Sequence, residues 1–113
     1  MSFNWKDFID FAKELMDATD EARLRSAISR AYYGVFCIAR NKKRLKEYKK
    51  KDVHSKVIES YKSSQDKDEK FIGKTLDELR RHRNDADYNE DKEITPALAR
   101  RSVLKAVRIL TKL

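Results

Sequence analysis

The longest apolar stripe of the chain lies in its first third and has helical spacing. Its members recur at intervals of three and four residues, which places them on one face of a helix. They are Leu24, Ile28, Ala31, Val35 and Ala39. We therefore expect a helix from about Glu21 into the region of Arg40. Ala27, Ala31 and Gly34 are small and lie close together on it, which permits close approach of another helix.

Helix signals recur along the rest of the chain, which contains only 2 Gly and 1 Pro in 113 residues. Helices are expected after Asn4, Asp52 and Thr95, and from about Lys67 through Tyr88. The Thr95-Pro96 pair is the clearest start signal, because proline is favoured at the first helical position. We expect one all-α domain over residues 1–113. It would be an antiparallel bundle of four main helices plus a short helix.

Several classes of protein are not expected from this sequence. Cys37 is the single cysteine, so neither a disulfide framework nor a Cys-rich zinc site is expected. His54 and His82 are the only histidines, and we expect no metal or cofactor. No apolar run approaches the roughly 20 residues that span a membrane, and the first residues lack the layout of a signal peptide. A cytoplasmic protein without membrane contact is expected.

The positive charge of the chain is concentrated in one segment. Residues 40–51 contain eight basic residues and one acidic residue, and they account for +7 of the net charge of +8. Such a segment is either a solvated linker or a phosphate-binding patch. The candidate residues for a patch are Lys42, Lys43, Arg44, Lys46, Lys49, Lys50 and Lys51.

A polar cluster interrupts the apolar face of the fourth expected helix. Arg83 shares that face with Leu79 and Ala86, so it occupies a position where a core residue is expected. A buried guanidinium needs a carboxylate, a backbone acceptor or a ligand. Arg83 could serve only to form a salt bridge with Asp87, four residues later in the helix. The more specific hypothesis is that Arg83 belongs to a binding or dimer-contact site. The candidate binding residues are Arg30, Arg80, Arg83, Asn84, Asp87 and Tyr88.

Three blocks of sequence resemble the HEPN family of small helical proteins. Residues 25–36, RSAISRAYYGVF, resemble the second-helix signature of that family. Residues 53–58, VHSKVI, resemble the segment that follows in one branch, and residues 79–88, LRRHRNDADY, resemble the R-x-x-A-D-Y ending of that branch. The blocks occur in the family's order, and the resemblance extends over nearly the whole chain. The resemblance implies a helical bundle that forms a homodimer, often in toxin–antitoxin or other defence systems.

The resemblance leaves the function open between binding and catalysis. Many HEPN proteins are metal-independent ribonucleases that use an arginine followed four to six residues later by a histidine. Arg83-Asn84 matches the start of that motif, but Asp87 and Tyr88 follow, and His82 precedes Arg83. We therefore expect a non-catalytic homodimer that binds RNA, a nucleotide or a partner such as a nucleotidyltransferase. One alternative is a metal-independent endoribonuclease with a rearranged site, in which Arg83 acts with His82 or Tyr88 and with Arg30 from the neighbouring helix. A structural helical adaptor is the other alternative.

Overall fold

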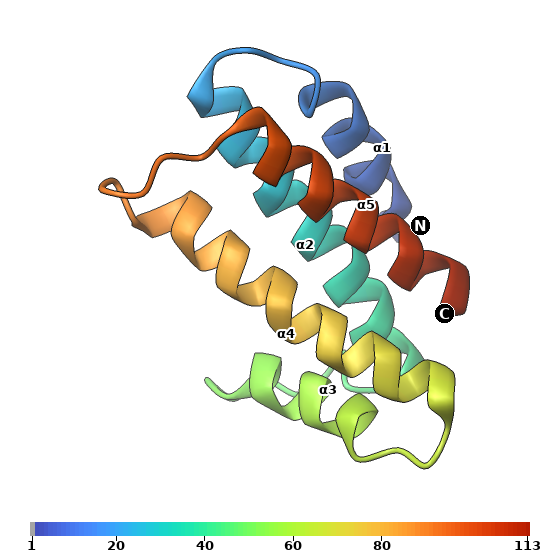
Figure 1. Cartoon of the computed structure of the whole chain (residues 1–113). Coiled ribbons are helices and arrows are strands. Elements are labelled where there is room, and N and C mark those ends of the chain that lie inside the picture. The colour runs from blue at the N-terminus through green and yellow to red at the C-terminus, as the bar shows by residue number, and fades with distance from the viewer. Residues whose placement is uncertain (1) are drawn as a thin grey trace.

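The computed structural model describes residues 2–113, which fold into five α-helices and no strand. Consecutive main helices run in alternating directions, as Figure 1 shows. This confirms the expected all-α bundle of four main helices plus a short one. The helices are α1 (Lys6–Leu15), α2 (Glu21–Lys42), α3 (Val53–Lys62), α4 (Lys67–Tyr88) and α5 (Pro96–Lys112).

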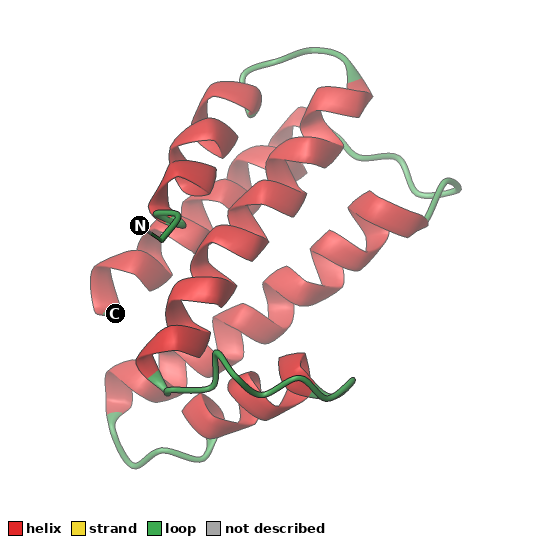
Figure 2. Ribbon diagram, turned by 180° about the vertical axis from the view of Figure 1, so that it is seen from behind, coloured by secondary structure: helices red, strands yellow, loops and turns green. Residues whose placement is uncertain are grey.

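The apolar helix α2 forms the centre of the bundle and packs against α1, α4 and α5. Its buried residues include all five members of the stripe that predicted it. The short helix α3 packs against α4 at the far end of the bundle from the α1–α2 loop (Figures 1 and 2). The Tyr61 hydroxyl also joins α3 to α2, because it donates a hydrogen bond of 2.8 Å to the Ala39 carbonyl.

The small-residue face of α2 is filled from within the chain. A Cβ added to Gly34 would lie 2.6 Å from Cγ1 of Ile9 and 3.2 Å from the Trp5 carbonyl oxygen, so α1 approaches α2 at backbone distance. The expected close approach of another helix is confirmed. Ala27, Ala31 and Gly34 are all buried within the chain, so this face gives no support for a homodimer.

Polar side chains cap most of the helices. The carboxylate of Asp20 accepts from the Arg23 backbone N–H at 3.1 Å, and Thr95 Oγ1 accepts from the Leu98 N–H at the same distance. Asp52 also occupies an N-cap position but caps nothing with its side chain. Its carboxylate accepts instead from the Tyr48 hydroxyl at 2.7 Å. The backbone N–H groups in the first turn of α3 therefore lack the side-chain acceptor that those of α2 and α5 have.

The basic segment leaves α2 and forms the loop between α2 and α3. Arg44 takes a left-handed backbone conformation with φ of 58°, which ends the helix. Lys43 turns back onto the bundle, with Nζ 3.0 Å from Glu69 and 4.6 Å from the centre of the Tyr61 ring. Arg44, Lys46, Lys49, Lys50 and Lys51 are exposed.

Candidate functional site

Arg83 is buried on the inward face of α4, as its spacing predicts, with 6% of its surface exposed. Its guanidinium lies among aromatic rings, with Cζ 5.3 Å from the centre of the Tyr32 ring and 5.1 Å from that of Tyr33. Tyr88, 77% exposed at the end of α4, lies on a third side at 6.0 Å. These rings stabilise the charge by cation–π contacts, which are stronger where water is excluded.

Among residues 2–113, the only carboxylate that Arg83 reaches is that of Asp87, one turn further along α4. The Nη1 of Arg83 lies 3.7 Å from Oδ2 of Asp87, which is an ion pair but too long for a hydrogen bond. The same Oδ2 accepts a hydrogen bond of 3.2 Å from the Ser29 hydroxyl of α2. Asp87 therefore offsets part of the charge and ties the end of α4 to α2.

Arg80 lies one turn before Arg83 and faces the start of α3. Its Nη1 donates to the Ser55 hydroxyl at 3.3 Å, which is a long bond. The Nε atoms of both Arg80 and Arg83 are enclosed and have no hydrogen-bond partner among the described residues. An enclosed N–H without an acceptor costs about 1–3 kcal/mol. Two such N–H groups lie on successive turns of α4, so a hydrogen-bond acceptor at this surface would be stabilising.

His54, in the first turn of α3, completes the cluster. Its Nδ1 lies 2.7 Å from the Tyr32 hydroxyl, and its ring stacks on Phe36 at 4.3 Å between centres. Burial, reinforced by the charges of Arg80 and Arg83, lowers the pKa of His54 to about 4. Burial also raises the pKa of Tyr32 well above its usual value, so the Tyr32 hydroxyl keeps its proton. The imidazole is neutral, and its tautomer decides whether Nδ1 accepts from this hydroxyl or donates to it.

The expected histidine partner, His82, is not part of this arrangement. Consecutive residues of a helix point about 100° apart, and His82 lies on the side of α4 that faces α5. Burial and the positive charge of Lys105 lower its pKa. Lys105 itself pairs with Glu78, with Nζ 2.7 Å from the carboxylate. The structure therefore does not bring His82 to Arg83, and of the two partners expected for a rearranged site it is Tyr88 that lies beside Arg83.

The remaining candidates divide between this cluster and other surfaces. Arg30 lies over the ring of Phe8 in α1, with Cζ 5.0 Å from the ring centre, rather than beside Arg83. Asn84 is exposed on α4 and makes no side-chain hydrogen bond in the described part of the chain. Arg80, Arg83, Asp87 and Tyr88 are brought together. The loop lysines precede His54 by only a few residues.

Two members of the site were not identified from the sequence. Tyr32 of α2 and His54 of α3 lie beside Arg83 of α4, with the Tyr32 hydroxyl 2.7 Å from His54 Nδ1 and the Tyr32 ring next to the guanidinium. The signal available was their position within two of the blocks that resemble HEPN proteins. Arg25 was also missed. It donates hydrogen bonds to the carbonyls of Asp85 and Ala86, both at 3.1 Å, and so holds the end of α4 that carries Asp87 and Tyr88.

A shallow hollow of 390 Å³ lies beyond Asp87, at the C-terminal end of α4. It is lined by Glu21, Asp87 and Glu90 together with Arg25, Ala86 and Tyr88. Three carboxylates against one guanidinium make it unfavourable for an anion. The electropositive part of the cluster is therefore the side of Arg80 and His54.

Other site types are not found among residues 2–113. No group of three or more His, Cys, Asp or Glu residues is placed to hold a metal ion there, and no helix in that range is long and apolar enough to cross a membrane. A comparison with family models, curated proteins and solved structures finds no match to this chain.

Proposed function

We propose that this protein is a non-catalytic, HEPN-like module that binds a phosphate group of RNA or of a nucleotide at the cluster of Arg80, Arg83, His54 and the tyrosines. The observation that carries the proposal is the pair of enclosed Nε–H groups on Arg80 and Arg83 that have no acceptor in the described chain. A phosphate offers several acceptor oxygens and negative charge, which suits two guanidinium groups.

The neutral imidazole of His54 supports binding rather than proton transfer. A general base at neutral pH needs a free lone pair and a pKa near 7. In His54 the Nδ1 atom is engaged by the Tyr32 hydroxyl, and the pKa is lowered to about 4. In the tautomer that carries the proton on Nε2, this N–H is a hydrogen-bond donor, which again suits an anionic oxygen. The ribonuclease alternative is tested by RNA cleavage.

Tyr88 is the part of the site that a ligand would displace. Its ring is the exposed one of the three around Arg83, and it lies at the last residue of α4. Rotation of this side chain would open Arg83 to the ligand without any change in the core. The bases of a single-stranded RNA can stack on such an exposed ring, which distinguishes RNA from free phosphate.

The binding test uses a fluorescent single-stranded RNA and, in a second arm, a mononucleotide. Arg80→Gln and Arg83→Met remove one guanidinium each, and the methionine keeps the stem of Arg83 in the core. We expect each to weaken binding about tenfold or more, because a charge-assisted hydrogen bond contributes roughly 1.5–3 kcal/mol. Arg81→Gln on the same helix is the matched control, since Arg81 is exposed and pairs with Asp77 at 3.4 Å.

The same samples test the non-catalytic and dimeric parts of the proposal. Intact RNA after incubation with the pure protein is expected, whereas cleavage that disappears in Arg83→Met would establish the ribonuclease. Equal binding by all three variants would remove the cluster from consideration. The homodimer rests on the HEPN resemblance alone, and a monomer by light scattering at micromolar concentration would contradict it.

A further inference from the structure

We propose that the groove between α4 and α5 is a docking site for an acidic, amphipathic segment of a partner protein. The groove lies on the side of α4 that carries His82, and its residues are not those of the phosphate-binding cluster. It takes in the part of the basic outer face of α5 that carries Arg101, Lys105 and Arg108. The other basic residues of that face are paired, Arg100 with Asp17 at 2.9 Å and Lys112 with Asp68 at 3.1 Å. The proposed function leaves this face unexplained.

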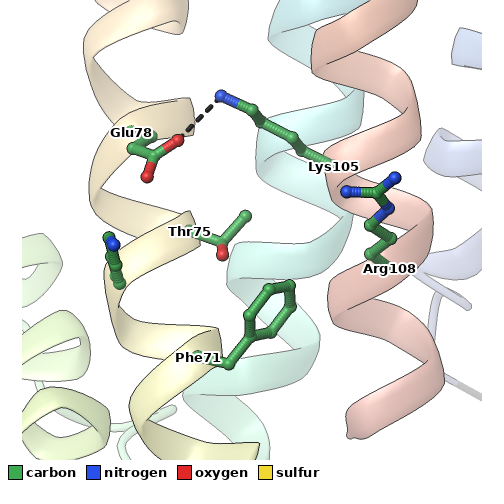
Figure 3. A pocket seen from close by; sticks show the side chains of 6 residues that line it. Phe71, Thr75, Glu78, Lys105 and Arg108 are labelled. Atoms are coloured by element: carbon green, nitrogen blue, oxygen red, sulfur yellow. Dashed lines mark hydrogen bonds and ion pairs between the residues drawn. The ribbon is translucent and has the colours of Figure 1, made fainter.

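Two neighbouring hollows shape the groove. The first, of 170 Å³, is drawn in Figure 3, where Phe71, Thr75 and Glu78 of α4 face Lys105 and Arg108 of α5. The second, of 210 Å³, lies on the outer face of α5 at the edge of the groove, where it is lined by Arg101, Leu104, Lys105 and Arg108 and shares the last two with the first hollow. Pockets for cofactors and drug-sized ligands measure about 300–1,000 Å³. Each hollow is therefore suited to a single side chain, and two adjacent hollows suit successive side chains of one peptide segment.

The charges around the groove favour an acidic partner. Lys105 is neutralised by Glu78 at 2.7 Å. Lys74, Arg101 and Arg108 have no carboxylate within ion-pair distance in the described chain. Three unpaired cations on the two rims give a positive field that attracts acidic side chains and rejects basic ones.

Apolar surface between these cations requires the partner to be amphipathic. Leu104 is 47% exposed and lies one turn from both Arg101 and Arg108. Phe71 lies at the other end of the groove, with Lys112 Nζ 5.3 Å from its ring centre. An amphipathic helix that alternates leucine-like anchors with carboxylates would cover both residues. Nucleic acid fits less well, because Leu104 has no ring on which a base could stack and Phe71 is only partly exposed.

The test measures the affinity of a fluorescent synthetic helix of leucine and glutamate. A length of about 18 residues spans the groove at 1.5 Å per residue. We expect Leu104→Gln and Arg108→Gln each to weaken binding about tenfold, as for central residues of an interface. Both side chains are exposed, so both variants fold. Lys49→Gln is the matched control, because it removes the same charge from the α2–α3 loop, and it should change the affinity by less than about twofold.

Three outcomes would overturn the proposal. One is failure of the wild type to bind the peptide. Another is equal weakening by Lys49→Gln and Arg108→Gln, which would make the effect one of net charge. The third is competition by single-stranded RNA that depends on Arg108, which would make the groove a nucleic-acid surface. Arg80→Gln should leave peptide binding unchanged, so this test stands or fails independently of the proposed function.

Discussion

His54 is the residue whose charge state the surrounding structure controls most clearly. Its ring is enclosed by Phe36, Tyr32 and Tyr33, and two guanidinium groups lie nearby. Both burial and these charges disfavour a proton on the ring, so the folded pKa falls to about 4 from the ordinary value of 6.5.

This shift predicts a loss of stability in acid. Between pH 6.5 and about 4 the unfolded chain protonates His54 while the folded chain does not, so the free energy of unfolding decreases as the pH falls. The contribution is fully present above pH 6.5 and is lost below the folded pKa. Because His54 is only partly enclosed, we expect a loss of about 1–3 kcal/mol. Urea unfolding measured at several pH values between 4 and 7 checks it.

His54→Gln separates this effect from general acid denaturation. Glutamine retains a hydrogen-bond acceptor for Tyr32 but does not titrate. The variant should lose less stability between pH 6.5 and 4 than the wild type does. His82, whose pKa is also lowered, remains in both proteins and its contribution cancels in the comparison. Parallel pH profiles for the two proteins would contradict the assignment.

Arg83 and His54 show which part of the site can be read from the sequence. The inward position of Arg83 follows from helical spacing alone, because its apolar neighbours lie on the same helix. Its contacts with Tyr32 and Tyr33, and the contact of Arg80 with Ser55, join helices that are distant in the sequence. Spacing within one helix carries no information on such contacts, so the role of His54 emerges only from the fold.

At the scale of the helices, Gly73 shows how closely α3 approaches α4. A Cβ at this position would lie 2.6 Å from the backbone nitrogen of Lys62 and 3.0 Å from its Cα. A backbone atom cannot move aside as the end of a side chain can. Glycine near the start of a helix looks from the sequence like a weak point, but the structure shows that it permits the packing of α3.

Gly73→Ala is therefore expected to destabilise the protein although alanine favours helices. The intrinsic preference gains about 1 kcal/mol, whereas overpacking at a close contact costs about 1–3 kcal/mol. We expect a net loss of up to about 2 kcal/mol in urea unfolding. Asn84→Ala on the exposed side of the same helix is the control, and it should not destabilise. A more stable Gly73→Ala protein would show that α3 moves freely on α4.

The ends of the helices were predictable where a side chain caps its own helix. Asp20 and Thr95 act within three residues of their position, so local sequence suffices to locate the starts of α2 and α5. Asp52 has the right residue type and position, but its carboxylate is engaged by Tyr48 from the preceding loop. Whether Asp52 caps α3 therefore depends on the conformation of the preceding loop. Hydrophobic periodicity predicts helices but not the conformation of a loop.

At the scale of the whole molecule, the positive charge lies on two separate surfaces. The α2–α3 loop carries exposed basic residues that precede His54, and the groove between α4 and α5 carries the second set. The loop has a single acidic residue among residues 40–51 and can extend the Arg80 and His54 surface along an RNA backbone. Its lysines would then contact phosphates in addition to the one held by the arginines.

This arrangement predicts the salt dependence of RNA binding. Each phosphate contact with a single strand contributes about −0.7 to the slope of the logarithm of the affinity against that of the salt concentration. Lys49→Gln with Lys50→Gln should reduce the magnitude of this slope by about 1.4 if both lysines contact phosphates. Lys6→Gln with Lys13→Gln makes the same change of charge on α1 and should leave the slope unaltered. Equal slopes for the two double variants would show that the loop is only a solvated linker.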